Sequence, residues 1–277
     1  MSTTEGSDLR SEVESLLWFH TIDLGNGITT PGNPPNEALE LPGAFPDVRG
    51  KSVLDIGTWD GKYAFRAEQQ GASRTVALDH YAWFVDFEAR NKYWAACQER
   101  GEFPDPSHEA QEFWHRDEMP GRRAFDLARR VLHSNVEPAV GDLMTMDLTE
   151  LGTFDVVLYL GVLYHMQEPL SALRRLRQVT RGMAVIETAA IRVPDREEDN
   201  FLMFFPGGEL GGDHGNWYAP SELALLSMCR AAGFAHAEAR VGPPPLIRRP
   251  QGIRSRMAGR CLPDDVHHYR AVVHAFA

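Results

Sequence analysis

Residues 51–65 constrain the fold of this chain more than any other stretch, because an apolar strand runs there into a glycine turn and then into a helix. The mostly apolar residues 53–56 are typical of a short strand buried in a parallel sheet. Gly57 and Gly61 let the backbone of the turn come close to a ligand, since glycine has no Cβ atom. Ligands of α/β folds bind at the ends of such strands. The stretch therefore predicts a nucleotide-cofactor site.

The residues of the turn narrow the choice of nucleotide. A dinucleotide site needs the pattern G-x-G-x-x-G, but here Trp59 occupies the second glycine position and Lys62 the third, and Trp59 would crowd a pyrophosphate. A second apolar strand, residues 75–78, ends in Asp79, about two dozen residues after Asp55. At that distance, a carboxylate from the next strand of a βαβ unit can accept hydrogen bonds from ribose hydroxyls.

Composition limits the size of the fold and the classes of partner. The chain has 277 residues, of which 43% are hydrophobic and 24% charged, and these values suit one soluble α/β domain with an extension or two small domains, of which a single core is the simpler interpretation. We divide it into an N-terminal cap or lid, residues 1–50, and a main domain, residues 51–277, with an insertion at about 81–120. The net charge is −11, with 28 Lys and Arg against 39 Asp and Glu. Bulk nucleic acid and anionic membranes would repel such a chain and are disfavoured as partners.

Cysteine usage and targeting signals indicate where the protein works. Cys97, Cys229 and Cys261 are far apart and odd in number, which favours reduced cytoplasmic thiols over a disulfide framework. We find no signal peptide and no apolar run long enough to span a bilayer. Almost all basic residues are arginines, which is typical of a GC-rich bacterial genome when Ala, Gly and Pro are also abundant. We therefore expect a cytoplasmic bacterial protein, and its oligomeric state stays open.

The N-terminal residues 1–50 are expected to form a helix and then an extended segment. Ser7 can cap an amphipathic helix over residues 7–18. Two brief strands are predicted to flank the turn at residues 25–27. Because this segment precedes the cofactor strand, it can either fold over the mouth of the sheet as a lid or cap an exposed edge. His20 is the titratable group of most interest within it.

The insertion after Asp79 is rich in aromatic residues and is broken by prolines. Its aromatic side chains could stack on a planar cofactor or substrate, or they could form part of the core. His115, Asp117 and Glu118 match no zinc-ligand spacing. We expect a solvated loop there and predict no metal site.

The remaining strands follow a doubly wound pattern. Residues 136–143 form the third strand, with Asp142 near its end. Residues 152–165 combine an Asp at the start, a near-continuous apolar run and a polar, aromatic exit. That combination describes a central parallel strand whose carboxyl end opens on the ligand. A helix over residues 169–180 and a strand over residues 183–188 complete another unit.

The C-terminal part is expected to close the sheet. Ser221 is the predicted N-cap of a helix over residues 221–232. Residues 235–241 and 268–276 would form an antiparallel pair of strands. Between them lies an arginine cluster that includes Arg248, and it is either a solvated loop or a site for bidentate binding of a carboxylate or phosphate.

Several motifs together resemble class I S-adenosylmethionine methyltransferases, and in particular the tRNA wobble-uridine carboxymethyltransferase-like family. The turn from Asp55 to Gly61 resembles the first motif of the class, and Asp79 resembles its ribose-binding acid. The likeness to the narrower family rests on residues 160–165, 168–170, 185–188, 216–220 and 231–234. The match covers most of the chain except part of the insertion and the loop after Gly242, and it suits shorter relatives without the large N-terminal domain.

This resemblance implies a doubly wound, mostly parallel, seven-stranded Rossmann-like sheet with an antiparallel C-terminal hairpin, an N-terminal cap and a helical insertion. It also implies S-adenosyl-L-methionine as the cofactor. The residues that it assigns to cofactor binding are Asp55, Gly57, Thr58, Trp59, Gly61, Asp79, His80, Asp142, Leu143, Leu160 and Gly161.

The resemblance also bears on the form of the cofactor. Tyr164 matches a tyrosine that helps to hold the carboxylate of a carboxylated cofactor, but the lysine and tryptophan of the larger domain have no counterpart. A buried carboxylate without a cationic partner is costly. We therefore expect plain S-adenosylmethionine.

The expected activity is methylation of an oxygen or nitrogen atom on a small molecule, in bacterial secondary-metabolite tailoring. The alternatives are modification of a tRNA wobble uridine and, in another class, a non-catalytic scaffold that binds the cofactor. Methyl transfer needs in-line positioning, with a base where the acceptor must lose a proton. The catalytic candidates are His165, Tyr164 and His20, with a structural hydrogen bond as the alternative role of His165. The candidates for substrate binding are Trp18, Trp83, Asn216, Trp217 and Arg248.

Overall fold

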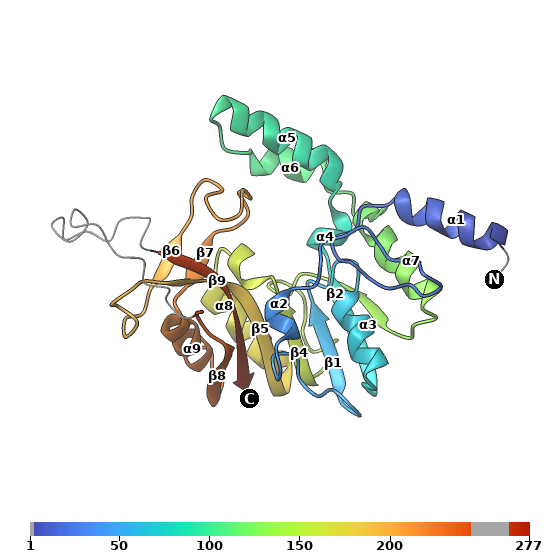
Figure 1. The fold of residues 1–277 in the computed structure, drawn as a ribbon. Helices are drawn as coiled ribbons and strands as arrows, with labels where there is room; N and C mark the ends of the chain where they lie inside the picture. The colour runs from blue at the N-terminus through green and yellow to red at the C-terminus, as the bar shows by residue number, and fades with distance from the viewer. Residues whose placement is uncertain (1–2, 245–265) are drawn as a thin grey trace.

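A computed structural model describes residues 3–244 and 266–277 of the chain. In this part of the chain, the centre is a seven-stranded sheet with the order β3-β2-β1-β4-β5-β9-β8 (Figure 1). The first five strands are parallel, and β9 runs antiparallel to both β5 and β8. This arrangement confirms the predicted doubly wound sheet with an antiparallel C-terminal pair. The strands are β1 (Ser52–Ile56), β2 (Arg74–Asp79), β3 (Glu137–Val140), β4 (Phe154–Leu160), β5 (Thr180–Arg192), β8 (His236–Val241) and β9 (His267–Phe276).

Different helices cover the two faces of the sheet, because side chains alternate along each strand. Leu54 lies on the face that packs against α8 (Pro169–Val179) and α9 (Glu222–Ala231). As predicted, Ser221 caps α9, since its side chain accepts a hydrogen bond from Ala224 N. Val53 lies on the opposite face. The helices of that layer are α1 (Thr3–Glu14), α2 (Glu37–Glu40), α3 (Lys62–Gln69) and α7 (Arg123–Val131), which follows the 3₁₀ turn η1 (Pro120–Arg122).

The N-terminal segment differs from the prediction in two details. Helix α1 already begins at Thr3, so Ser7 lies inside the helix and not at its N-terminus. The strands predicted beside the turn at residues 25–27 are reduced to isolated bridges. One reason is that Thr30 N–H donates to Ile22 O, whereas Ile22 N–H donates to the Thr30 hydroxyl at 2.7 Å. A side chain therefore takes the place of one rung of the backbone ladder.

The insertion after β2 forms an arm above the carboxyl ends of the parallel strands (Figure 1). It contains α4 (Tyr81–Phe84), α5 (Phe87–Arg100) and α6 (Pro106–Glu112). Asp86 caps α5 by accepting a hydrogen bond from Ala89 N at 3.1 Å, and Gly101 ends α5 in the left-handed conformation. Asp105 caps α6, whose first residue is a proline. Caps and prolines thus divide the insertion into helices.

A small hairpin that we did not predict from the sequence lies beside strand β5 of the central sheet. It consists of β6 (Leu202–Phe204) and β7 (Tyr218–Pro220), joined by residues 205–217. Residue Ser221, just after β7, forms a bridge to Ile191 of β5, so the loop at 205–217 starts and ends beside the central sheet. Among the described residues, no helix is both long and apolar enough to cross a membrane.

Candidate cofactor and acceptor site

The order of the strands reverses between β1 and β4, whose following helices pack on opposite faces of the sheet. Ligands of open α/β sheets bind in the crevice that such a divergence leaves. Gly57 follows β1 and Gly161 follows β4, each with a φ of +74°. A Cβ atom on Gly57 would lie 2.5 Å from Val162 Cγ2, so glycine is required for the two loops to lie this close. Leu160 ends β4 beside them.

Asp55 and Thr58 support the glycine turn from below. Asp55 is 3% exposed and accepts a hydrogen bond from the Thr58 hydroxyl at 2.7 Å. Burial raises the pKa of Asp55 to about 6, and the hydrogen bond from Thr58 opposes this effect. Because both side chains are buried, a ligand at the turn would meet the backbone of residues 57–61. Gly61 begins the next helix with a φ of +87°.

Asp79 holds the same turn from the end of β2. Its two carboxylate oxygens accept hydrogen bonds from Trp59 N at 2.9 Å and from Ala82 N at 3.0 Å. Burial raises the pKa of Asp79 to about 6, although these backbone hydrogen bonds favour the charged form. The backbone N–H groups of His80 and Trp83 also favour the charged form, so the backbone around the turn surrounds this carboxylate.

Trp59 ties three segments together at the turn. Its ring stacks between Phe19, at a centroid distance of 4.1 Å, and Phe87, at 4.6 Å. Its φ of +52° is unusual for a bulky residue, and such strain persists where the surroundings determine the conformation. Here the determinants are the stack, the hydrogen bond to Asp79 and a hydrogen bond of 2.7 Å from Trp83 Nε1 to Trp59 O.

His20 and Asp60 bring the N-terminal segment onto the cofactor turn. Asp60 is fully buried, and one of its oxygens accepts hydrogen bonds from Phe19 N at 2.9 Å and His20 N at 2.7 Å. The other oxygen is paired with His20 Nδ1. This pair places the N-terminal segment beside the site. Sequence reasoning missed Asp60, and the available signal was an acid between Trp59 and Gly61.

Tyr164 and His165 lie in the short 3₁₀ turn η2 (Leu163–His165), directly after the exit of β4. His165 is exposed, and its Nδ1 lies 3.0 Å from Gly215 O, which makes Nδ1 the donor of this hydrogen bond. The rings of the two residues lie 4.3 Å apart. Trp217 N donates to Tyr164 O at 2.8 Å, so residues 205–217 are fastened to this turn at two points.

Arg270 is a second functional candidate that sequence reasoning missed, because it lies on β9. Its guanidinium lies 4.8 Å from the centroid of the Tyr164 ring. The expectation that a carboxylate there would meet no cation is therefore wrong. Glu187, 1% exposed, nevertheless pairs with two nitrogens of Arg270, one at 2.6 Å. The pair of Arg270 and Glu187 has no net charge. A ligand carboxylate near Tyr164 would therefore meet the carboxylate of Glu187 as well as the guanidinium of Arg270.

The far side of the predicted cofactor site lies over β2 and β3. Asp142 caps the turn after β3, since its carboxylate accepts hydrogen bonds from Met144 N at 2.8 Å and from the Thr145 hydroxyl at 3.2 Å. His80 is half-buried, and burial lowers its pKa. The side chain of Leu143 is buried in the core, so a ligand could meet only its backbone.

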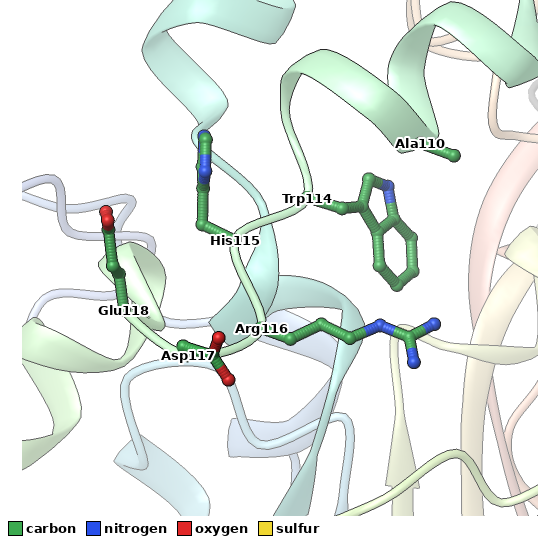
Figure 2. Close-up of a pocket in the computed structure, with 6 residues that line it drawn as sticks. All are labelled: Ala110, Trp114, His115, Arg116, Asp117 and Glu118. Atoms are coloured by element: carbon green, nitrogen blue, oxygen red, sulfur yellow. The ribbon is translucent and has the colours of Figure 1, made fainter.

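A pocket of about 380 Å³ adjoins this side (Figure 2). Trp114, which lines it, lies 5.9 Å from the His80 ring. Trp114 and Arg116 project to one side of their loop, whereas His115 and Glu118 project to the other. The described residues contain no cluster of metal ligands, in this loop or elsewhere.

The residues predicted to bind substrate separate into two groups. Trp18 and Trp83 are 6% and 0% exposed in one hydrophobic cluster, and their indole N–H groups bond to backbone carbonyls. Both are therefore core residues, which corrects the expectation of substrate contact. Asn216 and Trp217 lie in the loop beside η2, and Asn216 Oδ1 is buried with no hydrogen-bond partner in the described part of the chain. Arg248 lies outside the described residues.

Comparisons with known proteins bear on this arrangement. Residues 37–239 match a family described as "Methyltransferase domain". The chain is 30% identical over 190 residues to the tRNA U34 carboxymethyltransferase of Dichelobacter nodosus, which covers 68% of this chain and 46% of the relative. It is 28% identical over 193 residues to the enzyme of the same name from Pseudomonas putida, which covers 68% and 47%. The chain thus spans about half the length of the curated relatives that it matches.

Solved structures show a similar fold. The N-terminal domain of EvdMO1, determined in the presence of SAH and D-fucose, matches with a TM-score of 0.57 and 18% identity. The match covers 100% of this chain and 97% of that domain. A structure of the same domain with SAH bound gives the same TM-score and identity, with 98% of that chain covered. At this identity, the likeness supports the fold alone.

Proposed function

The chain belongs to the S-adenosylmethionine-dependent methyltransferase family, and we propose that it transfers a methyl group to a small-molecule acceptor. When bound, the cofactor supplies an electrophilic methyl group on its sulfonium. The residues at the strand ends suit this cofactor. Asp79 would accept hydrogen bonds from the ribose hydroxyls, Asp142 would face the adenine amino group, and residues 57–61 would let the methionine portion approach.

The observation that carries the small-molecule proposal is a contact above the carboxyl ends of the strands. The rings of Trp94 and Phe103, in the arm, lie 5.7 Å and 6.0 Å from the ring of His214, in the loop at 205–217. The arm starts above β2 and the loop starts beside β5, so together they bridge the ends of β1 and β4 (Figure 1). A site under such a bridge favours a small acceptor over a folded nucleic acid. The net charge of −11 points the same way.

Two histidines are proposed to accept the proton of a hydroxyl or amine. His20 Nδ1 is held by Asp60, and His165 Nδ1 is held by Gly215 O. In each ring, a protonated Nδ1 leaves Nε2 as the proton acceptor. His20 reaches the cofactor turn from the N-terminal segment, and His165 lies at the exit of β4. The structural alternative for His165 remains the hydrogen bond that holds the loop.

Plain S-adenosylmethionine is the proposed cofactor form. A carboxylated cofactor would place a carboxylate near Tyr164, where Arg270 is already neutralised by Glu187. Adding a second anion beside the buried Glu187 would cost free energy, since like charges at low dielectric repel.

Transfer of labelled methyl groups tests the proposal. The protein is incubated with S-adenosylmethionine that carries a tritiated methyl group, together with either the metabolite fraction or the tRNA fraction of a bacterial lysate. Label is expected in low-molecular-weight products. Label in tRNA alone would overturn the small-molecule proposal, and cofactor binding without label in either fraction would indicate a scaffold.

Modification of tRNA is the second candidate function. It is favoured by the identity of 30% and 28% to two tRNA U34 carboxymethyltransferases, but the chain covers less than half of each. The relatives are bacterial, which supports a bacterial source. We also propose a cytoplasmic location and a role in natural-product tailoring.

A further inference from the structure

A buried guanidinium in the arm has no role in the chemistry proposed above. Arg90, on α5, is 7% exposed. Its guanidinium carbon lies 4.1 Å from the centroid of the Trp94 ring and 4.6 Å from that of Phe87. Its hydrogen bonds go to Asn91 and Tyr81, and it forms no ion pair within the part of the chain that the structure describes. A buried cation without an anion is costly, although aromatic faces offset part of the cost.

Some N–H donors of the Arg90 guanidinium have no hydrogen-bond partner among the described residues. A guanidinium has five N–H donors and no acceptor. Asn91 Oδ1 accepts from Nε and from Nη2, and the Tyr81 hydroxyl accepts from Nη1. Two N–H groups therefore have no partner among the described residues. The Tyr81 hydroxyl also keeps its proton available, because burial raises its pKa. The pair presents only donors.

A chain of contacts links Arg90 to the proposed site of transfer. The guanidinium stacks on Trp94, and the Trp94 ring lies 3.7 Å from the position that a Cβ on Gly215 would occupy. Gly215 O in turn holds His165. On the other side, Tyr81 lies two residues after the end of β2, and its ring lies 5.4 Å from that of Trp114. Arg90 thus lies in the arm, next to the tryptophan that contacts the loop at 205–217.

The neighbouring acids already have partners of their own. Glu109 accepts the indole N–H of Trp94, and Asp213 accepts Gly215 N–H at 2.7 Å. Neither forms an ion pair with Arg90.

On the basis of the proposed methyl transfer, we infer that Arg90 and Tyr81 bind an oxyanion, a carboxylate or a phosphate, that the acceptor carries. The guanidinium and the phenol would supply up to three charge-assisted or neutral hydrogen bonds to such a group. The oxyanion would accept hydrogen bonds from the two unpaired N–H groups of Arg90 and would neutralise its charge. This would fix the acceptor under the bridge, with its nucleophilic atom turned toward the exit of β4.

Three small probes test the inference on the full chain with saturating SAH. Benzoate and phenyl phosphate carry the two oxyanions, and benzamide is the neutral counterpart. Binding is followed by the fluorescence of the tryptophans, one of which contacts Arg90. At least one oxyanion is expected to bind about tenfold or more tightly than benzamide, as one or two hydrogen bonds to a charged group imply.

The variants are Arg90→Met, Arg90→Lys and Tyr81→Phe, with Arg100→Gln as the control. Arg100 lies on the same helix but is exposed and pairs with Glu102. Arg90→Met is expected to abolish the preference for the oxyanion, and Arg90→Lys to reduce it. Tyr81→Phe should weaken oxyanion binding about threefold or more, and Arg100→Gln should change nothing.

Calorimetry with SAH distinguishes a failure of the oxyanion site from a failure of the proposed methyl transfer itself. Unchanged SAH affinity in all variants, with loss of oxyanion preference on changing Arg90, supports the inference. Equal binding of the three probes to the unaltered protein, or a preference that survives in Arg90→Met, overturns it. If Arg90→Met does not fold, Tyr81→Phe decides: oxyanion binding weakened about threefold or more supports the inference, and unchanged oxyanion binding overturns it. Absence of SAH binding to the unaltered protein would instead refute the methyltransferase proposal itself.

Discussion

The His20 ring and the Asp60 carboxylate are joined by a hydrogen bond between the N-terminal segment and the turn that follows β1. Asp60 also accepts hydrogen bonds from the backbone N–H groups of Phe19 and His20, so its carboxylate holds both the ring and the backbone of this segment. A histidine that is distant in the sequence thereby gains a fixed position beside the cofactor turn. The proposed acceptor base and the cofactor site depend on the same buried carboxylate.

Replacement of His20 by Ala is expected to leave SAH affinity nearly unchanged and to lower turnover about 10²-fold or more, because a general base contributes that much. His165→Ala is the matched comparison, since both rings have Nδ1 engaged and Nε2 available. Turnover with saturating acceptor decides between them. If both variants retain near-full turnover, neither residue is the base, and the acceptor is already nucleophilic.

Asp60→Asn is expected to lower the free energy of unfolding by about 2 kcal/mol, because the fully buried carboxylate accepts hydrogen bonds from Phe19 N, His20 N and the His20 ring, and an amide cannot replace all of them. Turnover should also fall if His20 is the base, since the ring would lose the group that fixes its tautomer. Chemical denaturation measures the first effect. Asp126→Asn is the control, because that carboxylate is exposed and pairs with Arg122 at the surface. Equal stability of the two variants would contradict the role assigned to Asp60.

The affinity for SAH is expected to fall as the pH drops through about 6. Burial raises the pKa of Asp79 to about 6, so the carboxylate is charged above that pH and protonated below it. A neutral carboxyl accepts the ribose hydrogen bonds less well than a carboxylate does. Calorimetry between pH 5 and pH 7.5 measures the change.

The variant Asp79→Asn is expected to bind SAH about tenfold more weakly at pH 7.5 and to show no decrease near pH 6. Asp55 is the alternative origin of such a decrease, because its pKa is also raised to about 6. A variant that keeps the full decrease would therefore assign the titration to Asp55.

Glu187→Gln should shift the preference between cofactor forms. In the unaltered protein, plain S-adenosylmethionine is expected to compete better than its carboxylated analogue, because Glu187 neutralises Arg270. Without the carboxylate of Glu187, Arg270 would be free to pair with the carboxylate of the analogue. Competition binding of the two forms to both proteins measures the shift. A carboxylated analogue that already binds more tightly to the unaltered protein would refute the assignment of the plain cofactor.

The sequence by itself determined the sheet and the line of residues at its edge. Parallel strands end at one edge, so Asp55, Asp79 and Asp142 had to come near one another once the strand-and-helix pattern was recognised. The C-terminal hairpin and the Ser221 cap are equally local in origin, because alternation and capping depend on a few consecutive residues.

The tertiary structure alone decided which side chains face the core and which face the site. Trp18, Trp83 and Trp94 are indistinguishable by residue type, yet Trp18 and Trp83 are buried in a hydrophobic cluster, whereas Trp94 lies in the arm and contacts His214. Aromatic residues suit a core and a binding surface equally well, and only long-range packing distinguishes the two.

The paired polar side chains show the same limit most clearly. Asp60 with His20, and Glu187 with Arg270, join residues that are distant in the sequence. Their energy depends on burial and on distances between side chains, neither of which is encoded in local periodicity. The spacing of acids and glycines therefore indicated where a cofactor would bind, whereas the folded chain determined which charges meet there.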